Sequence, residues 1–295
     1  MSDKYKAVWL SHSSVNDFLQ CQRLYYLKHV YKNQNKRKIS IANPYATLGV
    51  IVHLVLENLV HYKSEERVKQ NLLQQFQTEW ERLKYMAGFT EESEEKNFKE
   101  RGESMMKNVM QDFQLLKNKT IQQKDFYSGD FIPNIFLSEE ENIILCGPVD
   151  WIEYDEKAKG LILVDFKTGR NLEREDSRQL PIYKILVESL QNKWKVLGGK
   201  YWYLEKNEIQ KKKLDSDLIE QIKKELLEIG IQIRQKRFIF IDNVGWEHLR
   251  TKEVEENFSC NSDLKLCECH KYEKIINGQA KHIGQDLYGQ DLYVV

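Results

Sequence analysis

The sequence lacks a net charge and a long apolar run. Its 295 residues include 45 basic and 45 acidic side chains, so no general attraction to polyanions is implied, although basic clusters occur at 36–38 and 211–213. The most apolar window, residues 46–60, is interrupted by His53 and Glu57 and is too short to cross a bilayer. The first ten residues contain no apolar core of a signal peptide. We therefore expect a cytoplasmic protein without a membrane partner.

Cysteine is scarce, with five residues in the chain. In a reducing compartment, cysteines are more often free or metal-bound than joined in disulfides. Cys21 stands alone near the start, and Cys146 lies in an apolar run that predicts a buried strand residue. Cys260, Cys267 and Cys269 lie close together near the end and are candidates for a shared site.

Hydrophobic periodicity predicts an α/β fold, in which helices flank a short mixed sheet. The helix-prone, charged residues 63–130 indicate a helical insertion. The expected strands are residues 131–138, 142–154, 160–169, 199–207 and 208–214. The expected helices outside the insertion are residues 15–31, a segment from about Tyr45, residues 177–194 with Ser177 as a cap, and residues 215–236. We expect four parts: 1–62 (N-terminal helices), 63–130 (insertion), 131–257 (α/β core) and 258–295 (a cysteine-containing segment).

Charged residues interrupt the most apolar of these strands, "LILVDFKTGR". Asp165 and Lys167 lie two residues apart and therefore point to the same side of the strand. Asp150 ends the preceding apolar run and faces Asp165 if the two strands form a hairpin. Two close carboxylates favour a hard cation such as Mg²⁺ or Mn²⁺, and a nearby ammonium can stabilise charge on a phosphate. The alternative is a simple salt bridge between Asp165 and Lys167, with Asp150 in a turn.

The wider context resembles the PD-(D/E)xK nuclease superfamily, and within it the RecB-like branch. That branch includes the nuclease domains of recombination helicases and the CRISPR-associated spacer-processing nucleases. Five ordered segments carry the resemblance: "LSHSSVNDFLQCQRLYYLKHVY", "LGVIVHLVLE", "GPVDW", "VDFKTG" and "RQLPIYK". The resemblance implies a restriction-endonuclease-like core.

The resemblance also implies roles for individual residues. His53, Asp150, Asp165 and the backbone carbonyl of Phe166 correspond to metal ligands, and Mg²⁺ or Mn²⁺ is the implied ion. Lys167 corresponds to the catalytic lysine. "RQLPIYK" supplies Gln179 and Tyr183, four residues apart on one helical face, as further residues of the site. Two readings stay open: His53 is also typical of a hydrogen-bonded core residue, and Glu57 either orients its ring or is solvated.

In the iron–sulfur members of this branch, one cysteine of the first helix joins three near the C-terminus. Cys21, Cys260, Cys267 and Cys269 are the corresponding candidates for a [4Fe–4S] cluster, which would form a C-terminal clasp. Their spacing departs from the usual Cys-x-x-Cys pattern, and His270 is a candidate substitute ligand. A zinc site or free thiols are the alternatives.

The resulting hypothesis is a metal-dependent deoxyribonuclease, of exonuclease type, that acts on single-stranded DNA or DNA ends in repair, recombination or defence. No Gly-x-x-x-x-Gly-Lys-Ser/Thr motif occurs, so a helicase partner would be a separate chain. The alternative is an inactive nuclease-fold subunit that binds DNA within a larger assembly.

Overall fold

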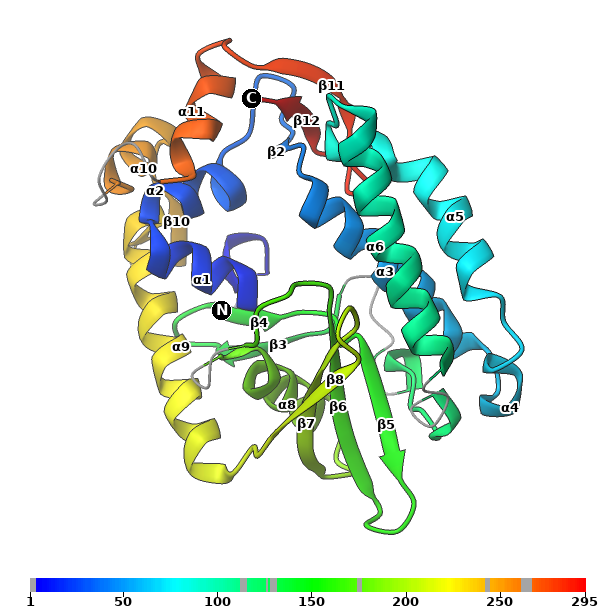
Figure 1. The fold of residues 1–295 in the computed structure, drawn as a ribbon. Coiled ribbons are helices and arrows are strands. Elements are labelled where there is room, and N and C mark those ends of the chain that lie inside the picture. Colours follow the sequence, from blue (N-terminus) through cyan, green and yellow to red (C-terminus); the bar gives the residue numbers. More distant parts are fainter. Residues whose placement is uncertain are drawn as a thin grey trace. The chain divides into compact units, whose positions relative to one another are not determined.

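The computed structural model describes residues 4–111, 116–125, 127, 132–173, 177–241, 245–260 and 267–295. Contacts divide the chain into two compact units, each assembled from separate segments of sequence (Figure 1). Unit 1 comprises Met1–Ala42, Asn134–Gly147 and Glu220–Val295, and unit 2 comprises Asn43–Pro133 and Pro148–Ile219. The four-part division expected from the sequence stays a prediction, because contacts alone do not show which parts fold independently.

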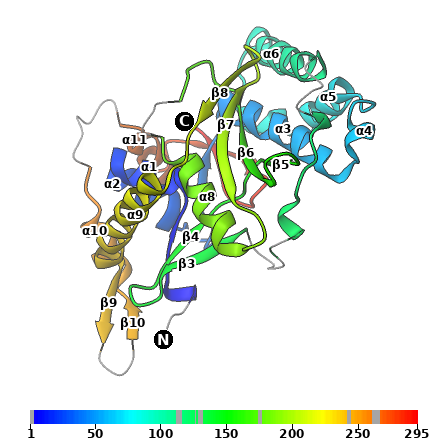
Figure 2. The same cartoon turned by 90° about the horizontal axis from the view of Figure 1, so that it is seen from below.

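Unit 2 is built on a mixed sheet with the strand order β5-β6-β7-β8. β5 and β6 form an antiparallel hairpin, β6 and β7 are parallel, and β8 is antiparallel to β7. The strands are β5 (Trp151–Asp155), β6 (Gly160–Lys167), β7 (Val196–Tyr203) and β8 (Glu208–Lys212). The parallel pair needs a crossover, which α8 (Gln179–Leu190) supplies along one face of the sheet (Figure 2). Leu180 of α8 packs there against Gly199.

The helical part of unit 2 comprises α3 (Pro44–Asn58), α4 (Ser64–Arg67), α5 (Leu72–Leu83) and α6 (Glu92–Gln111). Asn43 begins α3, because its side chain accepts hydrogen bonds from the first free amides and Pro44 follows at the first helical position. α5 buries Phe76 and Trp80, and Gly102 of α6 leaves room for the Phe76 ring. The region expected to be helical is therefore helical over most of its described residues.

The described residues of unit 1 form three small sheets. Their strands are β1 (Val8–Leu10), β4 (Ile143–Cys146) and β3 (Asn134–Ser138); β9 (Phe238–Ile241) and β10 (Gly245–His248); and β11 (Lys281–Gln285), β12 (Asp291–Val294) and β2 (Ile39–Ile41). The helices are α1 (His12–Gln20), α2 (Gln22–Tyr25), most of α9 (Ser216–Arg237), α10 (Thr251–Asn257) and α11 (Cys269–Ile276). α9 packs on β4 where Gly230 meets Ile143. No described helix has both the length and the apolar character needed to cross a membrane.

These elements confirm an α/β fold of small mixed sheets flanked by helices, consistent with a restriction-endonuclease-like core. The prediction of one strand over residues 142–154 is wrong. The run is divided between β4 and β5, which belong to different sheets. Pro148 lies between them and has no N–H for a strand ladder, so the apolar run breaks there. Ser177 is not the cap of α8 either: the cap position is Arg178, and the Ser177 hydroxyl bonds the Tyr201 hydroxyl at 3.1 Å.

The repeated GQDLY at residues 284–293 forms a hairpin in which the two copies differ in role. Asp286 lies in the turn and accepts hydrogen bonds from the backbone amides of Tyr288 and Gln290. Asp291, the matching residue of the second copy, is buried in β12 and accepts a hydrogen bond from Asn33 at 2.6 Å. One copy therefore makes the turn, and the other anchors the hairpin to the loop before β2.

Candidate functional site

Asp165 and Lys167 lie at the end of β6, on the same side of the strand. Asp165 is 1% exposed, whereas Lys167 is only partly buried. The β5–β6 register pairs Trp151 with Val164, and its continuation brings Asp150 opposite Asp165. The Asp150 carboxylate accepts a hydrogen bond from the Phe166 amide at 2.9 Å, which fixes it beside β6. The hairpin on which the sequence argument depended is therefore present.

Three polar side chains from two elements form a network around the Asp165 carboxylate. Lys167 Nζ lies 2.9 Å from Oδ2, and Gln179 Nε2 donates a hydrogen bond to Oδ1 at 2.5 Å. Gln179 Oε1 accepts a hydrogen bond from Lys167 Nζ at 2.5 Å, so one amide bridges both members of the pair. The Tyr183 hydroxyl, one helical turn further along α8, lies 2.9 Å from Gln179 Nε2 and 3.5 Å from Asp165 Oδ1. Gln179 and Tyr183 therefore belong to the same cluster as the strand residues.

His53 approaches this cluster from α3. Its Nε2 lies 3.0 Å from the backbone carbonyl of Phe166, and its Nδ1 lies 3.4 Å from Asp150 and 3.5 Å from Glu57. All of the predicted ligands thus lie within unit 2, around the end of β6. Their functional roles stay predictions.

Burial and neighbouring charge shift the pKa values of this cluster. Burial, reinforced by the Asp150 charge, raises the pKa of Asp165 to about 7, against the opposing effect of Lys167. Burial lowers the pKa of His53, but the Asp150 carboxylate and then Glu57 outweigh it, so the pKa lies well above its ordinary value. Burial likewise opposes protonation of Lys167, and the Asp165 and Glu173 carboxylates outweigh it and raise its pKa. The carboxylates thus favour positive charge beside them.

The chemistry of this donor set fits a hard divalent cation. Carboxylate and carbonyl oxygens with one imidazole suit Mg²⁺ or Mn²⁺. His53 Nε2 and the Phe166 carbonyl oxygen lie 3.0 Å apart, within hydrogen-bond distance. The donor atoms of His53, Glu57 and Asp150 lie within 4.8 Å of one another. Asp165 Oδ2 is buried and, among the described residues, its contact with Lys167 lacks hydrogen-bond geometry.

Two neighbours of the site were missed or left undecided by the sequence. Glu173, in the loop after β6, lies 3.1 Å from Lys167 Nζ as a second anion. Nothing in its spacing marks it, and only its place in a loop after a buried strand gave a signal. Glu57 lies 3.5 Å from His53 Nδ1 and is also partly exposed, so both interpretations of its role stay predictions.

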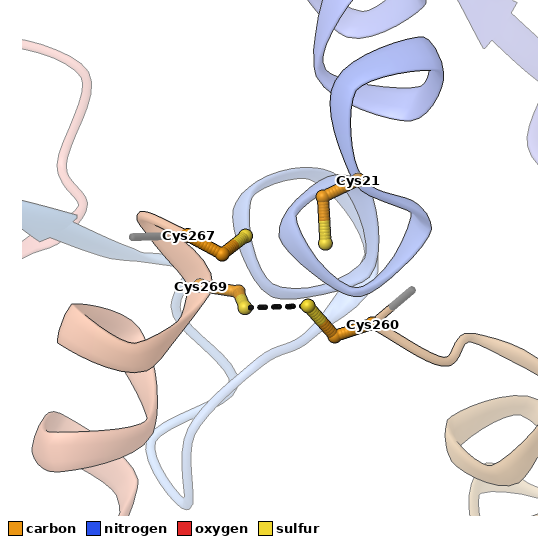
Figure 3. A group of neighbouring side chains, drawn as sticks. All are labelled: Cys21, Cys260, Cys267 and Cys269. Atoms are coloured by element: carbon orange, nitrogen blue, oxygen red, sulfur yellow. Dashed lines mark hydrogen bonds between the residues drawn. The ribbon is translucent and has the colours of Figure 1, made fainter. Parts of the chain in front are cut away.

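A second cluster in unit 1 gathers four of the five cysteines (Figure 3). The sulfur atoms of Cys21, Cys260, Cys267 and Cys269 lie within 4.8 Å of one another, and those of Cys269 and Cys260 are 3.6 Å apart. Cys21 lies between α1 and α2, and the other three lie between the end of α10 and the start of α11. Cys146 lies outside the cluster, buried in β4 as expected.

The cysteine cluster is a candidate metal centre, because only a cation makes four close thiolates favourable. Burial, together with the neighbouring sulfur atoms, raises the pKa of Cys21 to about 11 and also raises that of Cys269. None of the five cysteines, all of which lie among the described residues, forms a disulfide. The ends of unit 1 are also tied by Arg23 of α2, which pairs with Glu255 at 3.1 Å and Glu273 at 3.3 Å. The clasp predicted from the sequence is thus present as a four-cysteine group.

Comparison with known families identifies the superfamily of the chain. A family model described as the PD-(D/E)XK nuclease superfamily, whose members are generally metal-dependent nucleases, matches residues 9–262. Among curated proteins no relative matches the chain. The RecB-like branch stays a prediction, but the family model covers both the active-site cluster and most of the α/β fold. The chain belongs to the PD-(D/E)XK nuclease superfamily.

Proposed function

We propose that the chain is a Mg²⁺- or Mn²⁺-dependent deoxyribonuclease of the RecB-like branch. We further propose exonuclease action on single-stranded DNA or DNA ends, in DNA repair, recombination or defence. The observation that carries the proposal is the convergence of His53, Asp150, Asp165 and Lys167 at one strand end. A cytoplasmic location is also part of the proposal.

In this proposal, His53, Asp150, Asp165 and the Phe166 carbonyl hold the metal ion. The bound ion would polarise the phosphate and lower the pKa of a water molecule. His53 must release its proton to act as a ligand, and the raised pKa makes metal binding depend on pH. Lys167 stays protonated beside Asp165 and Glu173, so it orients water and stabilises phosphate charge rather than accepting a proton.

Gln179 and Tyr183 act as positioning residues in this scheme. The Gln179 amide fixes Lys167 Nζ with its oxygen and Asp165 with its nitrogen. Such a bridge keeps the ammonium and the carboxylate in one geometry, and small errors of position in an active site are costly. Tyr183 holds the Gln179 nitrogen from the next turn of α8.

We also propose that the cysteine cluster holds a [4Fe–4S] cluster, as the RecB-like resemblance implies. Four cysteine thiolates from both ends of the sequence are the ligand set that such clusters use. Zinc is the second candidate, supported by one observation. Tetrahedral Zn–S bonds of 2.3 Å separate the sulfur atoms by about 3.8 Å, close to the 3.6 Å between Cys269 and Cys260. Anaerobically purified protein should be brown with a stoichiometric iron content; colourless protein with one zinc per chain would contradict the iron–sulfur proposal.

The activity is tested by digestion of end-labelled single- and double-stranded DNA with Mg²⁺, Mn²⁺ or EDTA. The proposal predicts metal-dependent release of short products from ends, with single-stranded DNA preferred, and little cleavage by Lys167→Gln. Closed circular DNA is the control for endonuclease action. Binding without cleavage, identical in wild type and variant, would instead favour an inactive DNA-binding subunit. Cleavage that depends on an added helicase would support the proposed separate motor.

A further inference from the structure

Two adjoining hollows cross the surface of unit 2, and the first begins at the proposed metal site. Their volumes are about 910 and 900 Å³. Glu57 and Asp150 line the first hollow, and His61, Tyr62 and Gln122 are among the residues that line both. The two hollows therefore meet at these shared residues, and we refer to them together as the groove, whose first part lies beside the candidate metal ligands.

β5 follows this groove along its length. Residues 149–152 line the first hollow, and residues 153–157 line the second. The five residues of β5 span about 17 Å, which corresponds to about five nucleotides at a stacked spacing of 3.4 Å per nucleotide. The groove therefore has the length to hold a short stretch of a nucleic-acid strand that ends at the metal site.

The second hollow carries lysines whose charges are not neutralised by partners. These groove lysines are exposed, come from three separate stretches of sequence, and form no ion pair with any described residue: Lys63, Lys117, Lys119 and Lys157. The hollow also contains four acidic residues, of which Glu65 and Glu156 are exposed and the other two are engaged. Glu153 pairs with Lys200 at 2.8 Å, and Asp155 accepts hydrogen bonds from two backbone amides of the β5–β6 turn. Free ammonium groups along a groove are the arrangement that tracks a phosphate backbone.

The groove wall is built around a buried arginine. Arg67, 4% exposed, donates hydrogen bonds to the carbonyls of Leu59, Tyr62, Leu116 and Asn118 and to the Thr120 hydroxyl. The stretch that follows Asn118 then runs along β5, because the Tyr154 amide donates to the Lys119 carbonyl at 2.7 Å. The groove lysines at 117 and 119 are therefore held by fixed backbone.

A partly exposed aromatic ring lies among these lysines. Tyr154 lies on the edge strand β5, and Lys119 Nζ is 5.4 Å from the centre of its ring. Tyr62 is also partly exposed in the shared part of the groove. Aromatic rings beside cations favour a single strand, whose bases are free to stack, over a duplex, whose bases are already paired and stacked.

We propose that this groove binds the single-stranded DNA that leads to the scissile phosphate, with the groove lysines as phosphate contacts and Tyr154 as a stacking surface. The inference rests on the proposed nuclease function and specifies its substrate and the path that the substrate takes. None of these residues belongs to the metal site, so binding and cleavage are separable.

The test compares salt-dependent binding of three proteins to labelled oligo(dT) by fluorescence anisotropy, without added divalent metal. One is wild type, one carries glutamine at all four groove lysines, and one carries glutamine at two control lysines. The groove variant is Lys63→Gln, Lys117→Gln, Lys119→Gln and Lys157→Gln. The control is Lys96→Gln and Lys107→Gln, two exposed lysines of α6 that line neither hollow. Circular dichroism and the melting temperature check that all three fold alike.

The slope of log K against log salt is negative, and we expect its magnitude to decrease by about 3 in the groove variant. Each single-strand phosphate contact contributes about 0.7 to that magnitude, and four contacts are removed. Affinity at low salt should fall about tenfold or more, with the control unchanged. With Mn²⁺, the groove variant should show a raised KM and an unchanged kcat.

Equal binding by the groove and control variants, while wild type cleaves DNA, would overturn the proposed groove but not the proposed nuclease function. A groove-dependent loss of binding without cleavage by wild type would overturn the nuclease but not the groove. An equal loss on a hairpin duplex, or no binding by wild type, would overturn the single-strand assignment.

Discussion

Replacing Asp165 with asparagine should stabilise the metal-free protein while removing cleavage. Asp165 is almost fully buried, and burial together with the Asp150 charge raises its pKa from 3.8 to about 7. A carboxyl whose pKa is higher in the folded state opposes folding once it is ionised. Asp165→Asn keeps the shape of the side chain and removes its charge. In wild type, the carboxylate that the proposed activity needs therefore lowers the stability of the metal-free protein.

The size of the effect follows from the pKa shift. Each pKa unit corresponds to 1.36 kcal/mol, so the ionised Asp165 costs about 4 kcal/mol above pH 7. In the variant, Lys167 loses Asp165 as a charged partner and keeps Glu173. This loss costs about 1–3 kcal/mol. The net gain is about 1–3 kcal/mol, or several degrees in Tm at about 2–4 °C per kcal/mol. The destabilisation of wild type by ionised Asp165 is complete above about pH 7 and absent below about pH 4. The stability difference between the variant and wild type should therefore decrease as the pH falls.

The assay is thermal unfolding of wild type and Asp165→Asn at several pH values, with EDTA or with Mn²⁺. In EDTA at pH 8, the variant should melt higher. Mn²⁺ at 100 times its Kd stabilises a protein that binds it by about 2.7 kcal/mol. Mn²⁺ should therefore raise the melting temperature of wild type and leave that of the variant unchanged. The difference between the two melting temperatures should then become smaller or change sign. The control is Glu100→Gln, at an exposed position in the middle of α6, which should change neither melting temperature. A variant that melts below wild type in EDTA at pH 8 would refute the reasoning.

Three further predictions concern packing and the cysteine cluster. Gly102→Ala should lower the free energy of unfolding by about 1–3 kcal/mol, because the new methyl group overlaps the Phe76 ring. Gly169→Ala is the control, because the space around Gly169 is open and the new methyl group overlaps nothing. Urea titrations measure both free energies. Arg67→Lys should cost about 3 kcal/mol or more, because one ammonium cannot satisfy four carbonyls and a hydroxyl; an unchanged urea midpoint would contradict this. Cys21→Ser should release the bound iron or zinc, measured by metal analysis, and full retention would argue against a four-cysteine site.

The proximity of the candidate site residues was largely predictable because its signals are local, and their functional roles stay predictions. The positions of Asp165 and Lys167 follow from the alternation of side chains along one strand. That Asp150 faces Asp165 follows from the hairpin, since the register continues by one residue. The approach of Gln179 to both members of the pair depends on how α8 crosses the sheet, and no spacing in the sequence encodes it.

Other parts depended on contacts that sequence patterns do not carry. The break between β4 and β5 was missed, because the apolar residues on both sides of Pro148 suit one strand equally well. Glu173 was missed because a loop carboxylate shows no periodicity, and only the structure places it by Lys167. The cysteine group was anticipated through a resemblance, despite spacing that differs from the usual pattern.

Cleavage of single-stranded DNA by wild type and Asp165→Ala tests the central claim most directly. Single-turnover rates with Mn²⁺ and excess protein separate chemistry from binding. Loss of several kcal/mol of metal-assisted stabilisation predicts a fall of about a thousandfold or more in rate, with DNA binding retained through residues outside the metal site. Equal rates for the two proteins, or wild-type cleavage that persists in EDTA, would contradict a metal-dependent nuclease centred on Asp165.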